Sequence, residues 1–234
     1  MEITVNRIKC FCGIFGISNH PNASTMAYYG LHALQHRGQE ASGIVSHDVE
    51  SERAVFRIVK GEGLVSEVFS NFDDWRPQLQ GTAAIGHNRY STTGSSNSRK
   101  NIQPFVVNYH SGNLAVAHNG NLTNDKELRR WLVSEGSIFQ TSSDSEVFLH
   151  LIAKSKKKDQ REQIIEALGF VRGAFSVIIL TDKYLVVARD NHGFRPLCLG
   201  KLGDSWVAAS ETCAFDLISA EYIRDITPGE VLFI

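Results

Sequence analysis

The sequence predicts an α+β fold built from antiparallel sheets, and three observations support this prediction. Segments rich in apolar and β-branched residues, typical of strands, occur in the first half of the chain and again in its last third. A block with helical periodicity separates the two groups. The predicted strands are short and closely spaced, which favours hairpins over the alternating strands and helices of a parallel sheet.

The first predicted strand is CGIFGIS at 12–18, which alternates small and apolar residues and ends at a polar turn. A helix is expected from Ser24 to about Gln35, because apolar residues recur there at near-helical spacing. The serine-rich stretch at 91–101 predicts a long loop, a kind of segment that often carries function. Further strands of this half are expected at 43–47, 54–65, 82–91, 105–109 and 114–120.

The second half begins with the helical block and then returns to strands. Three helices are expected, at about Asn124–Ser134, Asp144–Lys154 and Gln160–Phe170. A last helix is expected at Glu211–Ile218. The strands of this half are expected at 174–182, 183–190, 196–200 and 205–210.

Composition excludes several classes of protein. The chain has 234 residues, of which 42% are hydrophobic and 21% charged, so one globular domain with a sizeable core is expected. The formal net charge of −1 gives no electrostatic signature of nucleic-acid or membrane binding. The sequence has no apolar run long enough for a membrane span and no secretory signal, so we expect a cytoplasmic protein that acts on small molecules.

The four cysteines, at 10, 12, 198 and 213, are too few and too scattered for a disulfide framework. Cys10 and Cys12 form a pair, but no second pair exists to complete a zinc site, so no metal is expected. Cys198 and Cys213 are expected to be small buried apolar residues.

A cysteine nucleophile needs a base to take its proton, and a nearby histidine is the usual partner. Nine histidines make that pairing possible without selecting one of them. A cysteine at the start of a chain has another route, because an α-amine with a pKa of ~7.7–8.0 is a better base at neutral pH than a lysine at about 10.4.

Five ordered motifs carry a resemblance to a known family. They are CGIFG at 12–16, LQHRGQEASG at 34–43, GHNRYSTTG at 86–94, AHNGNLTN at 117–124 and TSSDSE at 141–146. Together they resemble the class II glutamine amidotransferases. Four segments, the first of them within the second motif, are most similar to the glutaminase half of the members that use phosphoribosylpyrophosphate, and the likeness extends from Cys12 to Ile234. These segments are QHRGQ, GLVSEVF, DNHGFRPL and SETCAFD.

The resemblance implies a four-layer αββα sandwich of two stacked antiparallel sheets, the fold of the N-terminal nucleophile hydrolases. It also implies that a leader, Met1–Phe11, is removed, so that Cys12 becomes the first residue of a domain at 12–234. Cys12 would attack the side-chain amide of glutamine and form a thioester. The Asn119 side chain and the Gly120 backbone N–H would then form the oxyanion hole.

The same resemblance assigns the amino-acid end of glutamine. Arg89, helped by Thr92, would bind the α-carboxylate, and Asp144 would bind the α-ammonium. Arg37 and Gly38 would shape the site near Cys12. Structural alternatives exist for three of these assignments: Arg89 as a surface residue, Asp144 as a helix N-cap, and Asn119 with Gly120 as a hairpin turn.

The resemblance further implies that the ammonia reaches a phosphoribosyltransferase domain beyond Ile234. There it would replace the pyrophosphate of phosphoribosylpyrophosphate, giving phosphoribosylamine for purine synthesis. The chain shows no phosphoribosyl-binding pattern, so it is expected to lack transferase activity alone. No cofactor is expected in this domain. Magnesium, and in some relatives an iron-sulfur cluster, would come with the second domain, and the full-length enzyme is expected to be a homo-oligomer.

Two other functions remain open from the sequence. One is the glutaminase domain of another class II enzyme such as glucosamine phosphate synthase, against which QHRGQ and SETCAFD argue. The other is a catalytically silent module, which an uncleaved leader would produce. If the amine is not the base, His36, His87 and His118 are the histidines to consider.

Overall fold

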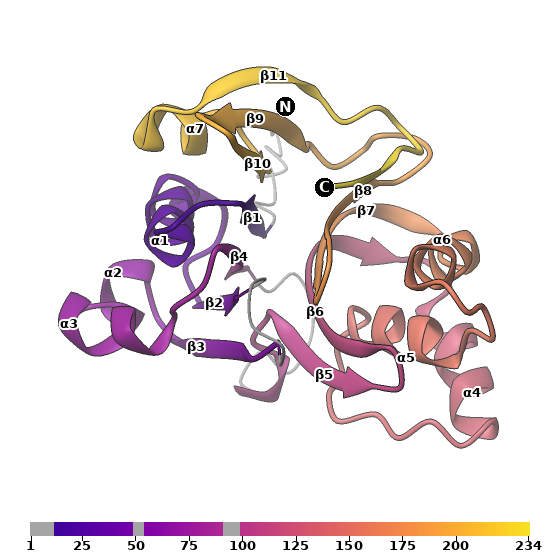
Figure 1. Ribbon diagram of the computed structural model, residues 1–234. Helices are drawn as coiled ribbons and strands as arrows, with labels where there is room; N and C mark the ends of the chain where they lie inside the picture. Colours follow the sequence, from indigo (N-terminus) through magenta and orange to yellow (C-terminus); the bar gives the residue numbers. More distant parts are fainter. Residues whose placement is uncertain (1–11, 49–53, 91–98) are drawn as a thin grey trace, which may run out of the picture.

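The computed structural model describes residues 12–48, 54–90 and 99–234, which form two stacked sheets with helices on both outer faces (Figure 1). In every sheet pairing the neighbouring strands are antiparallel. The larger sheet contains, in spatial order, β11 (Glu221–Asp225), β9 (Cys198–Leu202), β10 (Ser205–Ala209), β1 (Gly13–Ser18), β4 (Ala83–Arg89), β2 (Ala41–His47) and β3 (Phe56–Glu62). The smaller contains β12 (Val231–Phe233), β8 (Leu185–Arg189), β7 (Gly173–Thr181), β6 (Gly112–Leu122) and β5 (Phe105–Tyr109).

Each outer face has its own helices and its own hydrophobic core. The larger sheet is covered by α1 (Ala23–Ala33), α2 (Val65–Val68), α3 (Phe72–Trp75) and α7 (Cys213–Ile218). The smaller sheet is covered by α4 (Asp125–Ser134), α5 (Glu146–Lys154) and α6 (Gln160–Phe170). A third core fills the layer between the two sheets. The predicted four-layer αββα arrangement is therefore confirmed.

Side chains of strand β1 point alternately to its two faces and therefore belong to two different cores. Phe15 and Ile17 pack in the core on the helical side, whereas Ile14 packs between the sheets. Gly16 also faces the other sheet, since a Cβ atom built on it would lie 2.9 Å from the Cγ2 atom of Ile178. The strand is buried on both faces, which explains its nearly continuous small and apolar sequence.

Several element boundaries differ from the sequence prediction. The expected strand at 54–65 is β3 alone, because Gly63 turns the chain with a φ of +112° and α2 follows. Helix α5 begins at Glu146 instead of Asp144, and α7 begins at Cys213 instead of Glu211. Four short elements were not predicted from the pattern, namely α2, α3, β11 and β12. Segments of three to five residues carry too little periodicity to reveal themselves.

Among the described residues, no helix is both long enough and apolar enough to cross a membrane.

Candidate active site

The alternation of side chains along the two central strands brings Cys12 and Arg89 into the layer between the sheets. Cys12 lies two residues before Ile14, and Arg89 lies four residues after Ile85, so each shares the face of an inter-sheet core residue. The antiparallel register pairs Gly13 with Asn88, which places Cys12 beside the end of β4. Two residues 77 positions apart in the sequence thus meet at one end of the layer.

Asn119 enters the same layer from the smaller sheet. It follows Ala115 and Ala117 on the inter-sheet face of β6. Its side chain is completely buried, yet neither amide atom has a hydrogen-bond partner among the described residues. A buried amide without partners costs free energy, so it needs a reason other than stability.

Asn119 and Gly120 lie inside strand β6, where they pair with Ser176 and Phe175 of β7. The hairpin-turn alternative is therefore wrong. Gly120 has a φ of +154°, and a Cβ atom built on it would lie 2.2 Å from the carbonyl oxygen of Ala174. This position excludes every residue larger than glycine without movement of β7.

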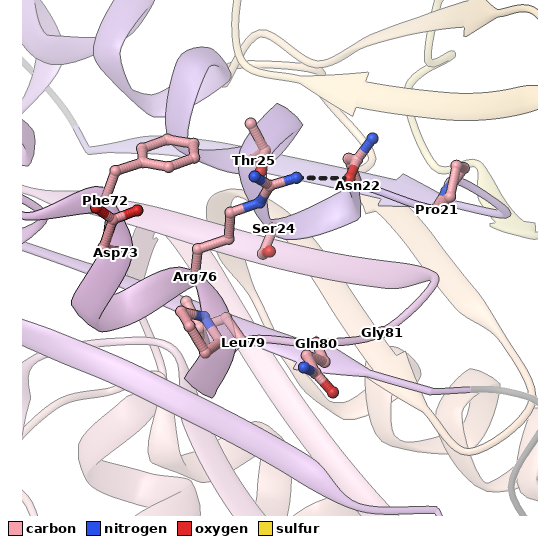
Figure 2. A pocket seen from close by; sticks show the side chains of 11 residues that line it. Pro21, Asn22, Ser24, Thr25, Phe72, Asp73, Arg76, Leu79, Gln80 and Gly81 are labelled. Carbon is pink, nitrogen blue, oxygen red and sulfur yellow. Dashed lines mark hydrogen bonds between the residues drawn. The ribbon is translucent and has the colours of Figure 1, made fainter.

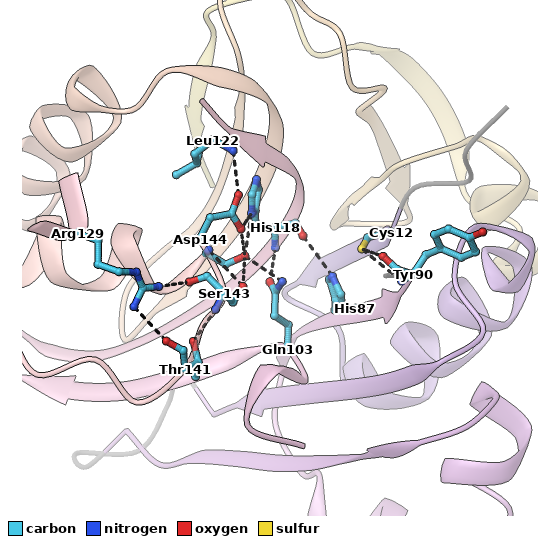
Figure 3. Close-up of polar contacts among 11 residues, drawn as sticks. Cys12, His87, Tyr90, Gln103, His118, Leu122, Arg129, Thr141, Ser143 and Asp144 are labelled. Atoms are coloured by element: carbon cyan, nitrogen blue, oxygen red, sulfur yellow. Dashed lines mark hydrogen bonds and ion pairs between the residues drawn. The ribbon is translucent and has the colours of Figure 1, made fainter. Parts of the chain in front are cut away.

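The Cys12 thiol contacts the backbone of Tyr90. The Tyr90 N–H donates to Sγ at 3.5 Å, and Sγ lies 3.7 Å from the Tyr90 carbonyl oxygen (Figure 3). Burial raises the pKa of the Cys12 thiol, the charge of Arg89 opposes this rise, and the charge of Asp144 adds to it. The thiol is therefore protonated at neutral pH and needs a base. The charges of Arg89 and Asp144 thus both act on the Cys12 sulfur, in opposite directions.

Arg89 is not a surface residue, since only 15% of its side chain is exposed. Its Nε atom lies 4.0 Å from a carboxylate oxygen of Glu40. Gly38 lets the turn at Gln35–Arg37 pack directly on the end of β4: a Cβ atom there would lie 2.8 Å from the carbonyl carbon and oxygen of Arg89. The predicted role of Gly38 in shaping the site thus has a steric basis.

Arg37 contacts the backbone of Cys12. Its Nε–H donates to the carbonyl oxygen of Cys12 at 3.1 Å, and its Nη1 donates to Glu211. Sequence reasoning did not single out Glu211, although the residue lies in the SETCAFD segment. Only the tertiary pairing of β10 with β1 brings it beside Cys12.

Asp144 lies two residues before the start of α5 and does not cap it, because the N-cap residue is Ser145. The Asp144 Oδ2 atom instead accepts a hydrogen bond from the Leu122 backbone N–H at 2.8 Å (Figure 3). Its Oδ1 atom lies 3.7 Å from Nδ1 of His118. The side chain is 18% exposed, so the carboxylate keeps an accessible edge at the end of β6.

A buried polar network that the sequence did not reveal supports Asp144 and Asn119. The Ser145 hydroxyl lies 2.8 Å from Nδ1 of His118 and accepts from the Gln103 amide at 3.0 Å. The Gln103 carbonyl oxygen in turn accepts from the His118 backbone N–H at 2.8 Å. The network joins the start of α5 to strand β6 next to Asn119. Its only sequence signal is that His118 and Ser145 lie within the motifs AHNGNLTN and TSSDSE.

Each of the three candidate histidine bases has at least one ring nitrogen in contact with another group. Burial and the neighbouring His118 lower the pKa of His87 to about 3, and its Nε2 atom lies 3.2 Å from the His118 carbonyl oxygen. Burial also lowers the pKa of His118, which faces α5 on the helical side of β6. His36 contacts Glu211 at 2.8 Å. Proton removal from Cys12 by a histidine is therefore disfavoured by this geometry.

Three further predictions concern residues outside the catalytic layer or outside the described part. Thr92 and the leader Met1–Phe11 lie outside the described residues. Cys198 is buried as predicted, and burial raises its pKa to about 12. Cys213 is only partly buried, contrary to the prediction, because it begins the short helix α7 near Ala33 and Glu211.

A surface cavity lies away from this layer, beside the start of α1 and helix α3 (Figure 2). It measures about 530 Å³, and Arg76 donates to the side-chain oxygen of Asn22 at 3.2 Å on its wall. None of the predicted site residues lines it. This cavity is therefore separate from the residues that carry the candidate chemistry.

Comparison with known proteins gives a coherent picture. The family model described as "Glutamine amidotransferase domain" matches residues 87–216, more than half of the chain. The chain is 47% identical to the amidophosphoribosyltransferase of Bacillus subtilis and 52% identical to amidophosphoribosyltransferase 1, chloroplastic, of Arabidopsis thaliana. Each match covers 95% of this chain but only 46% and 38%, respectively, of the relative.

A solved structure agrees in the same region. Glutamine phosphoribosylpyrophosphate amidotransferase from Bacillus subtilis, complexed with ADP and GMP, superposes with a TM-score of 0.87 at 46% identity. The match covers 95% of this chain and 47% of that one. The chain thus spans half or less of the length of each of these relatives.

Proposed function

The chain belongs to the glutamine amidotransferase family, and from this premise we propose that it hydrolyses glutamine to glutamate and ammonia with Cys12 as nucleophile. The observation that carries the proposal is Asn119, a fully buried amide without a partner among the described residues, which faces the layer into which Cys12 projects. A tetrahedral oxyanion would supply the acceptor that the Asn119 Nδ2 atom lacks.

The proposed reaction has two steps. The Cys12 sulfur attacks the side-chain amide carbon of glutamine, the C–N bond breaks, and the nitrogen leaves as ammonia after taking up a proton. Water then attacks the resulting thioester, which releases glutamate and returns the thiol. Asn119 and the Gly120 N–H stabilise the oxyanion of both tetrahedral intermediates.

Opposite charges would orient the amino-acid end of glutamine. Arg89 carries the positive charge for the α-carboxylate, and Asp144 carries the negative charge for the α-ammonium. The opposite effects of the two charges on the pKa of the Cys12 thiol support this arrangement. Thr92 is proposed to assist Arg89.

The base is proposed to be the α-amine of Cys12 after removal of Met1–Phe11. An amide nitrogen has no basic lone pair, so the intact chain would be inactive. The raised pKa of the thiol and the engaged histidines support this choice. No base other than the residue's own amine is then required.

The ammonia is proposed to serve the formation of phosphoribosylamine from phosphoribosylpyrophosphate in a phosphoribosyltransferase domain. The similarity to amidophosphoribosyltransferases over 95% of the chain supports this acceptor. Magnesium and any iron-sulfur cluster would belong to that domain. A four-iron cluster needs four thiolates, whereas the described residues supply only Cys12, Cys198 and Cys213.

The test is an assay of glutamate and ammonia release by a protein that begins at Cys12, with Cys12→Ala as the control. Release by the first protein only is expected. A chimera joining this domain to the remaining part of the Bacillus relative should also release pyrophosphate when glutamine and phosphoribosylpyrophosphate are both supplied. Absence of glutaminase activity from a folded, fully processed protein would support the silent module. Hydrolysis with fructose 6-phosphate as acceptor in a longer protein would support the glucosamine phosphate synthase alternative.

A further inference from the structure

Glu211 lies at the end of a short chain of polar contacts that begins at the nucleophile residue. The Cys12 carbonyl oxygen accepts from Arg37 Nε at 3.1 Å, and Arg37 Nη1 donates to Glu211 Oε1. The other carboxylate oxygen, Oε2, lies 2.8 Å from Nε2 of His36. Both oxygens of Glu211 are thus engaged, and one of its partners touches the backbone of Cys12.

The position of Glu211 is itself fixed relative to the start of β1. The preceding residue, Ser210, accepts from the Ile14 N–H through its hydroxyl at 3.0 Å. The Ser210 N–H donates to the Ile14 carbonyl oxygen, also at 3.0 Å. The residue before Glu211 is therefore bonded to Ile14, two residues after Cys12, through one backbone and one side-chain contact.

Arg37 needs a fixed negative partner in this location. Only 11% of the Arg37 side chain is exposed. Its charge also acts on a second guanidinium, that of Arg195, whose pKa is lowered first by burial and then by Arg37. Burial alone would raise the pKa of Glu211, but hydrogen bonds from Arg37 and His36 outweigh it and lower that pKa. Glu211 is therefore ionised at neutral pH and balances the charge that Arg37 carries into the site.

We propose that Glu211 is a positioning residue for Cys12, acting through Arg37. Because Arg37 holds the carbonyl oxygen of Cys12, its orientation sets the peptide plane of the nucleophile residue. That plane determines where the amine and the sulfur of Cys12 point. Glu211 touches neither glutamine nor the reacting atoms in this role, and the proposal rests on the proposed glutaminase function.

A metal ion is the competing explanation for this cluster. Ligand atoms of His36, Glu211 and Cys213 lie within 4.8 Å of one another. Arg37 already neutralises the same carboxylate, however, and its guanidinium would repel a second cation. The observations therefore favour the ion pair over a metal site.

The experiment compares Glu211→Gln with Glu211→Asp in the protein that begins at Cys12. The first variant keeps the shape of the side chain and loses its charge, whereas the second keeps the charge on a shorter side chain. Glu211→Gln should lower kcat for glutamine hydrolysis by roughly ten- to a hundred-fold with little change in KM, because the reacting groups lose their alignment. Glu211→Asp should recover part of this loss.

Glu230 offers a matched control. It forms an ion pair with Arg224, with contacts of 2.6 and 2.8 Å, and it belongs to no part of the site. Glu230→Gln should change Tm without changing kcat. An equal loss of kcat in Glu230→Gln and Glu211→Gln, or an effect of Glu211→Gln on Tm alone, would overturn the proposal.

A double-mutant cycle tests the route through Arg37. Once Arg37→Met has removed the link, Glu211→Gln should have little further effect on kcat, so the two losses should not add. Additive losses contradict the proposed route.

The rate at which iodoacetamide alkylates Cys12, followed by peptide mapping across a range of pH, gives a readout independent of glutamine. Glu211→Gln should shift this rate profile, whereas Glu230→Gln should not. If the wild-type protein hydrolyses no glutamine but the shift is seen, the proposed function fails while the positioning role stands. An unshifted alkylation profile in Glu211→Gln counts against the positioning role in either case.

Discussion

Asp144 accepts a hydrogen bond from the backbone N–H of Leu122 at 2.8 Å, which links the segment before helix α5 to the end of strand β6, the strand that contains Asn119. The carboxylate proposed to bind substrate therefore also satisfies a backbone group at the end of β6. Loss of the charge and loss of the hydrogen bond are separable, because asparagine keeps an oxygen acceptor and alanine does not.

Substitution of Asp144 should separate binding from stability. Asp144→Asn should lower kcat/KM for glutamine by about two to three orders of magnitude, since removing one partner of a desolvated charge pair costs roughly 3–5 kcal/mol. Its Tm should stay close to the wild-type value. Asp144→Ala should lose the same activity and in addition ~1–3 kcal/mol of unfolding free energy, because the Leu122 N–H loses its partner. Near-normal kcat/KM in Asp144→Asn, measured by glutamate release, would contradict the binding role.

Asn119→Ala should reduce activity without the usual loss of stability. Removal of an oxyanion-hole donor lowers kcat by about 10²–10³. The amide has no hydrogen-bond partner among the described residues, so its removal relieves a desolvation cost that offsets the small cavity. Urea unfolding should therefore give a midpoint equal to or above that of the wild type. A large fall in the midpoint would show that the amide is bonded in the free protein.

Gly38→Ala should disturb Arg89 through the backbone. The added Cβ atom would lie 2.8 Å from the Arg89 carbonyl group, so the turn and the end of β4 must separate. We expect a higher KM for glutamine and a lower Tm. Gly169→Ala in α6 is the control, because nothing lies within 4 Å of its Cβ position, and it should stabilise the protein by about 0.5–1 kcal/mol without changing KM. Equal effects of both substitutions on KM would exclude the steric explanation.

His87 predicts a loss of stability in acid. Its folded-state pKa of about 3 lies below the unfolded value of about 6.5, so the unfolded chain binds a proton first as the pH falls. The free energy of unfolding should therefore decrease from about pH 6.5 to about pH 3, by up to ~1.4 kcal/mol per pH unit for one such group. His118 acts in the same direction. His87→Gln should flatten the dependence of Tm on pH. The control His32→Gln, at an exposed position, should not. An unchanged slope in His87→Gln would refute the lowered pKa of His87.

Alkylation should distinguish Cys12 from the buried Cys198. In a protein that begins at Cys12, a diazo-ketone analogue of glutamine should label Cys12, because the analogue binds where the substrate does. Cys198 should stay unlabelled, since burial holds its pKa at about 12.

The chain with its leader intact should hydrolyse glutamine far more slowly than the processed form. If mass spectrometry shows an intact leader and equal rates, the amine cannot be the base and the histidines must be reconsidered.

The sequence by itself determined the fold class and the residues proposed to act on glutamine. Alternation of small and apolar residues in CGIFGIS and the β-branched, apolar composition of AFSVIILTD indicated strands, and the five motifs indicated the family. This succeeds because alternation and motif spacing are local properties that persist whatever the rest of the chain does. The same locality explains the misplaced starts of α5 and α7, where a side chain engages another strand or turn instead of its own helix.

Only the tertiary structure decided which residues support those that the motifs named. Three features arise only when strands distant in the sequence pair. Glu211 contacts Arg37, and Ser145 and Gln103 form a hydrogen-bonded network with His118. The Asn119 amide is buried without a partner among the described residues. No local pattern encodes such contacts, since each depends on the register of two sheets and on the burial that their stacking creates. The motifs thus identified the candidate chemistry, and the packing of the two sheets determined the electrostatic surroundings in which it would operate.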